Sequence, residues 1–201
     1  KAINIAPNLD YLLGTFIFNK NALCNWSFHR ENLENLKNKI SNNYKASIPF
    51  YILSIYDSLP LQKISAQINV KDKFPNINKI NSITKKNLNK KIRIGYYSGD
   101  FREHPVSYQL VHLLESHDRS KFEIYGFSFG PKNEDEIKKR ISLSFDKFLD
   151  VSLKSDKDIV RLSRELEIDI SIDLMGLTRH NRFGIFVERC APIQVNFLGY
   201  A

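Results

Sequence analysis

The sequence is poor in cysteine. Cys24 and Cys190 are the only two among 201 residues, and they lie far apart in the chain. Two isolated cysteines supply neither a disulfide framework nor the paired thiols of a structural zinc site. We therefore expect reduced, buried thiols and a cytoplasmic protein.

Long apolar runs are also lacking. None approaches the roughly 20 residues that span a bilayer. No basic-then-apolar leader opens the chain, which begins with Lys1 rather than Met. With 201 residues, of which 42% are hydrophobic, the chain fits one large domain or a small domain with an appendage. The sequence thus predicts a soluble fragment of a longer protein, without a membrane partner.

Glycine-rich nucleotide loops are missing too. The loop after the first predicted strand contains a single glycine, Gly99, so the three-glycine dinucleotide signature is absent. No segment ends in the Gly-Lys-Ser/Thr of a phosphate-binding loop. NAD, FAD and ATP hydrolysis are therefore disfavoured, and no cofactor is expected.

The formal net charge of +8 arises in the N-terminal part of the chain. Residues 1–91 hold 14 Lys/Arg and 5 Asp/Glu, whereas residues 92–201 hold 16 and 17. Between residues 71 and 91, seven lysines and one aspartate alternate with Asn and Ile, with almost no aromatic residues for stacking on bases. We expect a solvated basic linker over residues 75–90 and no nucleic-acid partner, with an electrostatic docking patch as the alternative.

Residues 1–74 carry helical spacing. Ser27 is a candidate cap for the second of the helices, and Asn19-Lys20-Asn21 is expected to weaken or end the first. The expected helices begin after Pro7, around Trp26, after Pro49 and after Pro60. They resemble the end of a helical repeat array, although no clean period is present, and the simpler interpretation is a helical appendage packed on the next domain.

From Lys91 onward the pattern changes to strands that alternate with helices. This alternation predicts an α/β fold with a Rossmann-like parallel sheet of five strands, in the order 3-2-1-4-5 with the first strand central. The expected strands are residues 92–98, 122–129, 148–151, 168–174 and 193–198. The expected helices are residues 106–117, 134–145, 156–166 and 182–190.

The loop after the first strand is the candidate site, because ligands of open α/β sheets bind at the carboxyl ends of strands. It carries Asp100, Arg102, Glu103 and His104 within five positions. His104 precedes Pro105 at the expected start of a helix, where the positive end of the helix dipole disfavours an imidazolium ion. A neutral ring would be available as a base or a hydrogen-bonding group; the alternative is a merely exposed loop histidine. Asp100 is expected to hold the loop through backbone amides.

A second candidate lies at the end of the fourth predicted strand. Asp173 precedes the loop Met175-Gly-Leu-Thr178. It is either functional or a strand-end aspartate that binds nearby backbone amides.

Several segments, taken together and in order, resemble the O-GlcNAc transferase and SPINDLY family. The first is Ile92-Arg-Ile-Gly-Tyr-Tyr-Ser-Gly-Asp-Phe-Arg-Glu-His-Pro105. It is followed by Lys121-Phe-Glu-Ile-Tyr-Gly-Phe-Ser, Asp173-Leu-Met-Gly-Leu-Thr and Ala191-Pro-Ile-Gln-Val-Asn-Phe-Leu-Gly-Tyr. Residues 1–74 resemble the segment of bacterial members between their tetratricopeptide repeats and the catalytic region.

The resemblance implies one half of an inverting glycosyltransferase of the B-type fold, residues 91–201, which moves a sugar from a nucleotide donor to Ser or Thr hydroxyls of proteins. UDP-GlcNAc is the first candidate donor, with UDP-glucose and GDP-fucose as alternatives among relatives. The missing C-terminal half would hold most of the donor, so the fragment alone should be inactive. A catalytically silent relative that binds a protein partner is the other hypothesis.

The resemblance also implies roles for single residues. His104 falls on the active-site histidine, assigned to proton abstraction or to positioning, and no metal is expected. Tyr108 stands where vertebrate-type members have a second histidine, so that ring's role does not transfer. The expected substrate-binding residues are Asp100, Pro105, Gly176, Leu177, Thr178 and, as a weak candidate for the diphosphate, Arg182.

Overall fold

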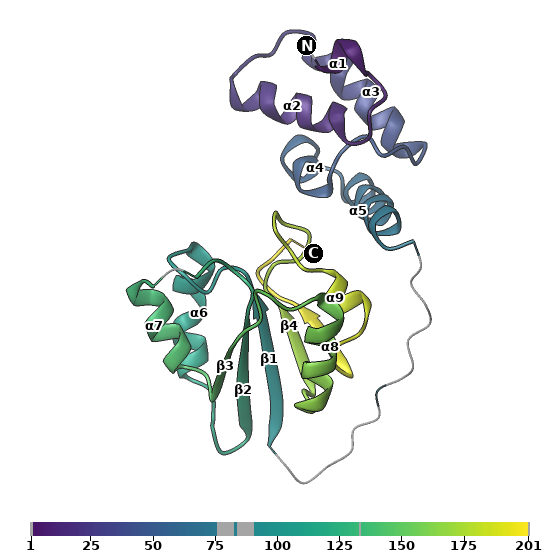
Figure 1. Ribbon diagram of the computed structural model, residues 1–201. Helices are drawn as coiled ribbons and strands as arrows, with labels where there is room; N and C mark the ends of the chain where they lie inside the picture. The colour runs from purple at the N-terminus through teal and green to yellow at the C-terminus, as the bar shows by residue number, and fades with distance from the viewer. Residues whose placement is uncertain (1, 76–82, 84–90, 133, 201) are drawn as a thin grey trace. The chain divides into compact units, whose positions relative to one another are not determined.

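The computed structural model describes residues 2–75, 83, 91–132 and 134–200. The chain divides into two compact units, Lys1–Asn76 and Ile77–Ala201, which are treated separately (Figure 1). The predicted basic linker, residues 75–90, lies almost entirely outside the described residues. The expected packing of the helical segment on the sheet stays a prediction.

The first unit is helical in its described residues, as predicted. Its elements are α1 (Ala2–Ile5), α2 (Leu12–Ala22), α3 (His29–Ser41), α4 (Pro49–Ile55) and α5 (Leu59–Lys73). The short α1 was not predicted, and α2 continues through Asn19-Lys20-Asn21 to Ala22. The predicted Ser27 cap is wrong: the cap residue is Phe28, in a left-handed conformation with φ 55° and without a side-chain hydrogen bond. The turn that leads into α3 therefore depends on backbone geometry and not on a capping hydroxyl.

The apolar faces predicted for the helices meet in one core. Its buried members come from α2, α3, α4, α5 and the segment before α4: Leu13, Ile17, Leu36, Ile40, Ala46, Ile52 and Leu61. Each buried leucine or isoleucine of this core contributes about 1.5–3 kcal/mol. The core, rather than capping, accounts for the stability of this unit.

Cysteine exposure differs from the expectation at one position. Cys190 is buried, as predicted, but Cys24 is exposed, and neither forms a disulfide. Cys24 lies in the turn between α2 and α3 with φ 51°. Cys24 therefore belongs to a surface turn and not to the helical core.

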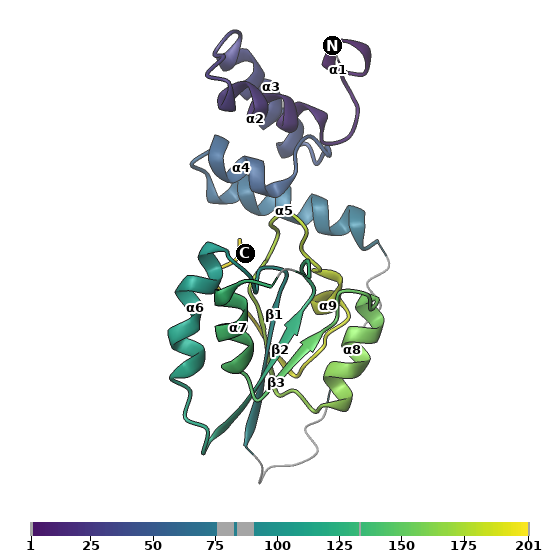
Figure 2. The ribbon, with the colours of Figure 1, turned by 60° about the vertical axis from the view of Figure 1, so that its left-hand side comes forward.

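The second unit is an α/β sandwich with five parallel strands in the order β3-β2-β1-β4-β5, as predicted. The strands are β1 (Ile92–Ser98), β2 (Phe122–Ser128), β3 (Lys147–Asp150), β4 (Ile170–Asp173) and β5 (Ile193–Asn196). The helices are α6 (Pro105–Glu115), α7 (Glu136–Leu143), α8 (Asp156–Glu165) and α9 (Gly184–Val187). Figure 2 shows α6 and α7 on one side of the sheet and α8 and α9 on the other.

The last helix is shorter than predicted. The pattern indicated a helix over residues 182–190, but α9 spans only Gly184–Val187. Arg189 turns the chain with φ 55° and donates to the Pro192 carbonyl oxygen, at 2.8 Å. Two carbonyls just after α9, those of Glu188 and Arg189, accept hydrogen bonds from the Arg164 side chain. Within α9, the Phe186 carbonyl accepts from the Gln194 side chain, at 3.0 Å, so two side chains serve this helix end.

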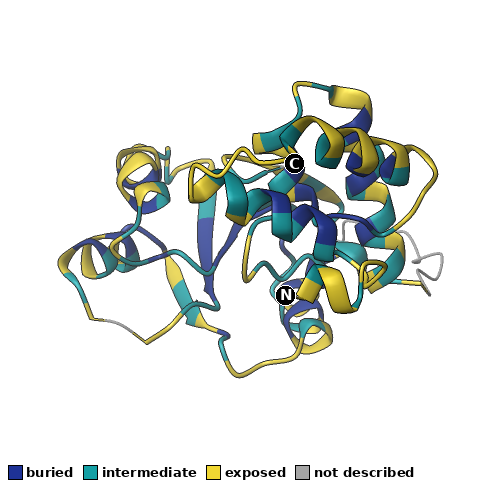
Figure 3. Ribbon diagram, turned by 90° about the horizontal axis from the view of Figure 1, so that it is seen from above, coloured by how far each residue is buried: buried dark blue, intermediate teal, exposed yellow. Residues whose placement is uncertain are grey.

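Alternate residues of β1 supply the two cores of the sheet. Ile94 and Tyr96 belong to the cluster under α6 and α7, and Tyr97 belongs to the cluster under α8 and α9. In Figure 3 the dark blue of buried residues follows the central strands. Because β1 is covered on both faces, its carboxyl end is rigidly placed, and the loop that follows starts from a fixed point.

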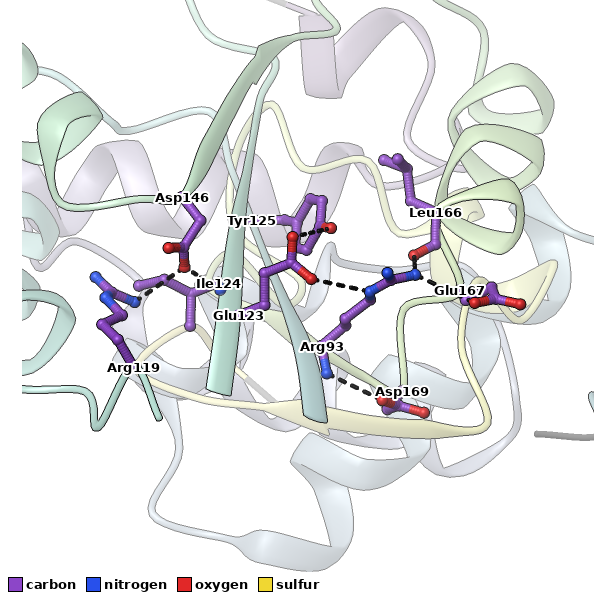
Figure 4. A network of polar contacts seen from close by, with 9 residues as sticks. All are labelled: Arg93, Arg119, Glu123, Ile124, Tyr125, Asp146, Leu166, Glu167 and Asp169. Atoms are coloured by element: carbon purple, nitrogen blue, oxygen red, sulfur yellow. Dashed lines mark hydrogen bonds and ion pairs between the residues drawn. The ribbon is translucent and has the colours of Figure 1, made fainter. Parts of the chain in front are cut away.

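An ionic network joins the strands at the opposite, amino end of the sheet (Figure 4). Arg93 donates from Nε to Glu123, at 3.0 Å, and from Nη1 to the carbonyl of Leu166 and to Glu167, at 2.9 and 3.2 Å. The Arg93 backbone amide donates to Asp169, at 2.9 Å. One guanidinium therefore connects β1 with β2 and with the segment before β4.

Glu123 is charged within this network. Burial alone would raise its pKa, but hydrogen bonds from Tyr125 and Arg93 hold the pKa below its usual range. A carboxylate with a depressed pKa contributes stability that is present above its unfolded-state pKa and is lost as the pH falls. The network is therefore strongest at neutral pH and weakens in acid.

We expect Arg93→Met to lower the free energy of unfolding by about 2 kcal/mol, because three partly buried acceptors lose their donor. Denaturant titration followed by circular dichroism measures the change. Lys121→Met is the matched control, since the Lys121 side chain is 73% exposed at the same edge of the sheet. It should change the value by no more than about 0.5 kcal/mol. Equal effects of both substitutions would contradict a structural role for the network.

Candidate active site

Two loops meet at the carboxyl edge of the sheet, one after β1 and one after β4. Ser98, the last residue of β1, places its hydroxyl 3.7 Å from the sulfur of Met175. A Cβ atom on Gly99 would lie 3.7 Å from the Met175 methyl carbon. The loop after β2 also approaches, since a Cβ on Gly130 would come within 1.9 Å of the Gly99 carbonyl oxygen. The sheet order thus brings together the two loops that the sequence singled out.

Two buried serines hold the loop after β1. The Ser98 hydroxyl accepts from the Asp100 amide, at 2.9 Å. The Ser107 hydroxyl donates to the Asp100 carbonyl, at 2.6 Å, and accepts from the Arg102 amide, at 3.2 Å. Both serines are fully buried. The expectation that the Asp100 carboxylate holds this loop through backbone amides is therefore wrong, because serine hydroxyls bind those amides.

The Asp100 carboxylate instead contacts two side chains of its own loop. Oδ1 accepts from Nη2 of Arg102, at 3.0 Å, and Oδ2 lies 3.7 Å from Nε2 of His104. The structure therefore brings together two of the site residues predicted from the sequence, Asp100 and His104. Arg102 fixes the orientation of the carboxylate that faces the ring.

His104 is the cap residue of α6, as predicted, with Pro105 in the first turn. Its Nδ1 accepts a hydrogen bond from the Val106 amide, at 3.3 Å. A nitrogen that accepts carries no proton, so the neutral ring has its proton on Nε2, on the side of Asp100. In this arrangement the Nδ1 lone pair is occupied and Nε2 is a donor. The contacts favour positioning over proton abstraction by this ring.

Asp173 organises the loop after β4. Its carboxylate accepts from the amides of Met175 and Gly176, at 2.9 and 3.1 Å, and from the side chain of Asn196, at 3.3 Å. Burial raises the pKa of Asp173 above its usual value. Of the two interpretations open from the sequence, the structure shows the aspartate that binds backbone amides.

Gly176 lies where a side chain does not fit. Its φ is +56°, and an added Cβ would come within 1.9 Å of the Tyr200 carbonyl oxygen. The same oxygen accepts from the Leu177 amide, at 2.7 Å. Thr178 closes the loop by donating from its hydroxyl to the Met175 carbonyl, at 2.9 Å. Gly176, Leu177 and Thr178 thus form one tight turn beside the segment that follows β5.

Arg182 is placed differently from the other candidates. It donates to Asp156, at 2.7 Å, and to the carbonyls of Lys154 and Val151, at 2.7 and 3.4 Å. Its guanidinium also lies 5.8 Å from the centre of the Phe129 ring. These contacts connect the segment before α9 to the start of α8 and favour a structural role. Binding of a diphosphate by Arg182 would require the ion pair with Asp156 to open.

The sequence interpretation missed four residues that shape the site: Ser98, Ser107, Asp135 and Asn196. Asp135 caps α7 by accepting from the Lys138 amide, at 2.8 Å, and also accepts from the Glu103 amide, at 3.0 Å. An aspartate just before a helix is a recognisable cap signal. The two serines gave no such signal, because their role depends on burial beside a loop.

Two further observations concern metal binding and membrane insertion. Within residues 2–75, 83, 91–132 and 134–200, no group of three or more His, Cys, Asp or Glu side chains is arranged to hold a metal ion. In the same ranges, no helix has the length and apolar character needed to cross a membrane.

Comparison with known proteins decides the family. The model of glycosyl transferase family 41 matches residues 49–201. This chain belongs to that family. The match begins at α4 and includes the whole α/β unit, with both loops of the candidate site.

Individual relatives agree with this family. The chain is 35% identical over 111 residues to the probable UDP-N-acetylglucosamine–peptide N-acetylglucosaminyltransferase SEC of Arabidopsis thaliana, covering 55% of this chain and 11% of that protein. It is 34% identical over 116 residues to the probable enzyme SPINDLY of the same plant, covering 54% and 12%.

A solved structure resembles nearly the whole chain. A mutant of the O-GlcNAc transferase of Thermobaculum terrenum matches 99% of this chain with a TM-score of 0.66 and 26% identity. The chain spans 39% of that structure. Both units therefore have counterparts in a larger protein of the same family.

Proposed function

We propose that this chain is part of an inverting protein glycosyltransferase that moves GlcNAc from UDP-GlcNAc to Ser or Thr hydroxyls. The observation that carries the proposal is the Asp100–His104 pair at the start of α6, on the carboxyl edge of the sheet, where ligands of open α/β sheets bind. The names of the relatives support the donor and the peptide acceptor. The protein is proposed to act in the cytoplasm, in keeping with two free thiols.

The residues of this chain serve the acceptor side of the reaction. An inverting transfer forms a bond between the acceptor oxygen and the anomeric carbon while the bond to the diphosphate breaks on the opposite face. The acceptor must be held in line with that bond, and its proton must leave. His104, with its ring held between Val106 and Asp100, positions the reacting groups, and the turn at Gly176 lines the sugar side.

Transfer of a labelled sugar tests the function. A longer version of the protein is incubated with UDP-GlcNAc and a protein acceptor, and the modified Ser or Thr is identified by mass spectrometry. Modification is expected. No transfer by a folded protein that still binds a protein partner would overturn the proposal in favour of a catalytically silent binding module.

Donor binding by the 201-residue chain alone should be weak. Most of the nucleotide is proposed to bind outside this chain, so titration with UDP or UDP-GlcNAc should show no dissociation constant below about 1 mM, or about 4 kcal/mol of binding free energy. Isothermal titration calorimetry measures it, with the longer protein as the control. Micromolar binding to this chain would mean that the donor site has been misplaced.

A further inference from the structure

The ring of His117 connects the end of α6 to the central strand of the sheet. His117 follows the last turn of α6, and its Nε2 lies 2.7 Å from the hydroxyl oxygen of Tyr96 on β1. The ring also makes an edge contact with Phe122, the first residue of β2, with the ring centres 5.8 Å apart. Helix α6 therefore has a histidine at each end, His104 as its cap in the candidate site and His117 against β1.

The Tyr96 hydroxyl uses this ring as its hydrogen-bond partner. Tyr96 is only 2% exposed and belongs to the core cluster under α6 and α7. Its hydroxyl proton is satisfied when the neutral His117 ring accepts at Nε2 and carries its own proton on Nδ1. A protonated imidazole has a donor on both nitrogens. Protonation of His117 would therefore leave the proton of a buried hydroxyl without its acceptor, which is unfavourable.

The surroundings of His117 also disfavour an imidazolium ion. Burial, the largest cause, and the positive charge of Arg119 lower the pKa of His117 below its ordinary value, and Asp146 offsets only part of this. The Asp146 carboxylate is already engaged, since it pairs with Arg119 at 3.4 Å and accepts from a backbone amide at 2.7 Å. Glu115 and Asp118, the acidic residues that flank His117 in sequence, form ion pairs with other side chains.

We propose that His117 is an acid-sensitive latch: its neutral ring fixes the end of α6 to β1 by accepting the Tyr96 hydroxyl proton, and protonation of the ring breaks this bond. Because the folded protein favours the neutral ring, the unfolded state binds more protons between the folded-state pKa and the ordinary pKa of about 6.5. The stabilisation is complete above the ordinary pKa and is lost as the pH falls through the folded-state pKa.

The latch concerns the stability of the α/β unit and does not depend on sugar transfer. A consequence for turnover rests on the proposed function, because the helix that the latch holds carries His104 at its other end. The experiment is therefore a stability measurement on the 201-residue chain. Its failure would leave the proposed function untouched, and the reverse also holds.

Hydrogen exchange of the β1 amides, which reports opening of the α/β unit, tests the proposal. Protection factors are measured by mass spectrometry at about pH 7.5 and about pH 5.5, on either side of the ordinary histidine pKa, with the intrinsic exchange rates divided out. Protection in the wild-type chain should fall between the two pH values. In His117→Gln, whose amide oxygen can accept from Tyr96 at either pH, the fall should be smaller by about threefold.

His112→Gln is the matched control, because His112 lies on the same helix and its side chain is 78% exposed. His112 lies 3.4 Å from Glu115 and forms an ion pair with it only when protonated, so its replacement should not reduce the fall in protection. Equal falls in the wild-type chain and in His117→Gln would overturn the proposal. An equal reduction by both substitutions would do so as well.

A titration of the wild-type chain by NMR gives a second measurement that requires no variant to fold. The ring signals of His117, assigned through their contacts with the Phe122 ring, should titrate at lower pH than those of the exposed His112. Titration of His117 at the same pH as His112, or at a higher one, would mean that the Tyr96 bond does not hold the ring neutral.

Discussion

His104→Ala in the longer enzyme is expected to lower turnover by about 100-fold or more, the range usual for a lost acid, base or positioning group. The ring is held by the Val106 amide on one side and lies beside Asp100 on the other, so its removal takes away the group that we propose positions the acceptor. Steady-state kinetics with a protein acceptor measure the change. Near-normal transfer by a folded His104→Ala enzyme would contradict this assignment of the loop.

His104→Asn distinguishes the role of the imidazole ring in turnover from the role of residue 104 as the cap of α6. Asparagine is a favourable cap residue whose oxygen replaces Nδ1 as the acceptor for the Val106 amide. Stability should be unchanged in His104→Asn and reduced by only about 1 kcal/mol in His104→Ala. Turnover should fall in both. If His104→Asn were fully active, the residue would serve only to cap α6.

Asp100→Asn provides a second comparison at the same loop. The loop is held by Ser98 and Ser107, so the fold should tolerate the amide. The negative charge beside His104 is lost, and the orientation of the ring should loosen. We therefore expect reduced turnover with little change in stability. A loss of turnover equal to the loss of stability would point to a purely structural role.

Gly176→Ala is expected to lower the free energy of unfolding by about 2 kcal/mol. The position has φ +56°, and the added methyl group would come within 1.9 Å of the Tyr200 carbonyl oxygen. Either the turn or the segment after β5 must move, which breaks the hydrogen bond from the Leu177 amide. Denaturant titration of the 201-residue chain measures the stability. Turnover of the longer enzyme should fall as well, since the turn lines the proposed sugar side.

Gly99→Ala is the control for this substitution. Gly99 is not in the left-handed region, and its added Cβ would meet only side chains, with Phe129 nearest at 3.3 Å. The cost should stay within about 1 kcal/mol, because an aromatic ring can shift by a few tenths of an ångström. A cost at Gly99 equal to that at Gly176 would show that crowding at this edge, and not backbone conformation, limits both positions.

The sequence alone was sufficient to predict the architecture of the α/β unit. Strands such as Ile92–Ser98 and Phe122–Ser128 alternate with amphipathic helices, and this local periodicity leads to a parallel sheet through the handedness of βαβ connections. The cap at His104 was predictable for a similar reason: it depends on the residue itself and on the proline that follows. Predictions failed locally at Ser27, because the turn before α3 uses left-handed backbone at Phe28 in place of a hydroxyl cap.

Only the tertiary structure decided which groups hold the candidate site. Ser98 and Ser107 bind the loop because the sheet buries them beside it, and Asn196 reaches Asp173 because β4 and β5 are neighbours. The ion pair between Arg182 and Asp156 joins residues from separate βα connections. Such partners are set by strand order and register across the sheet. Local sequence patterns contain no record of them, because each pattern reports the environment of one segment and not the identity of its neighbour.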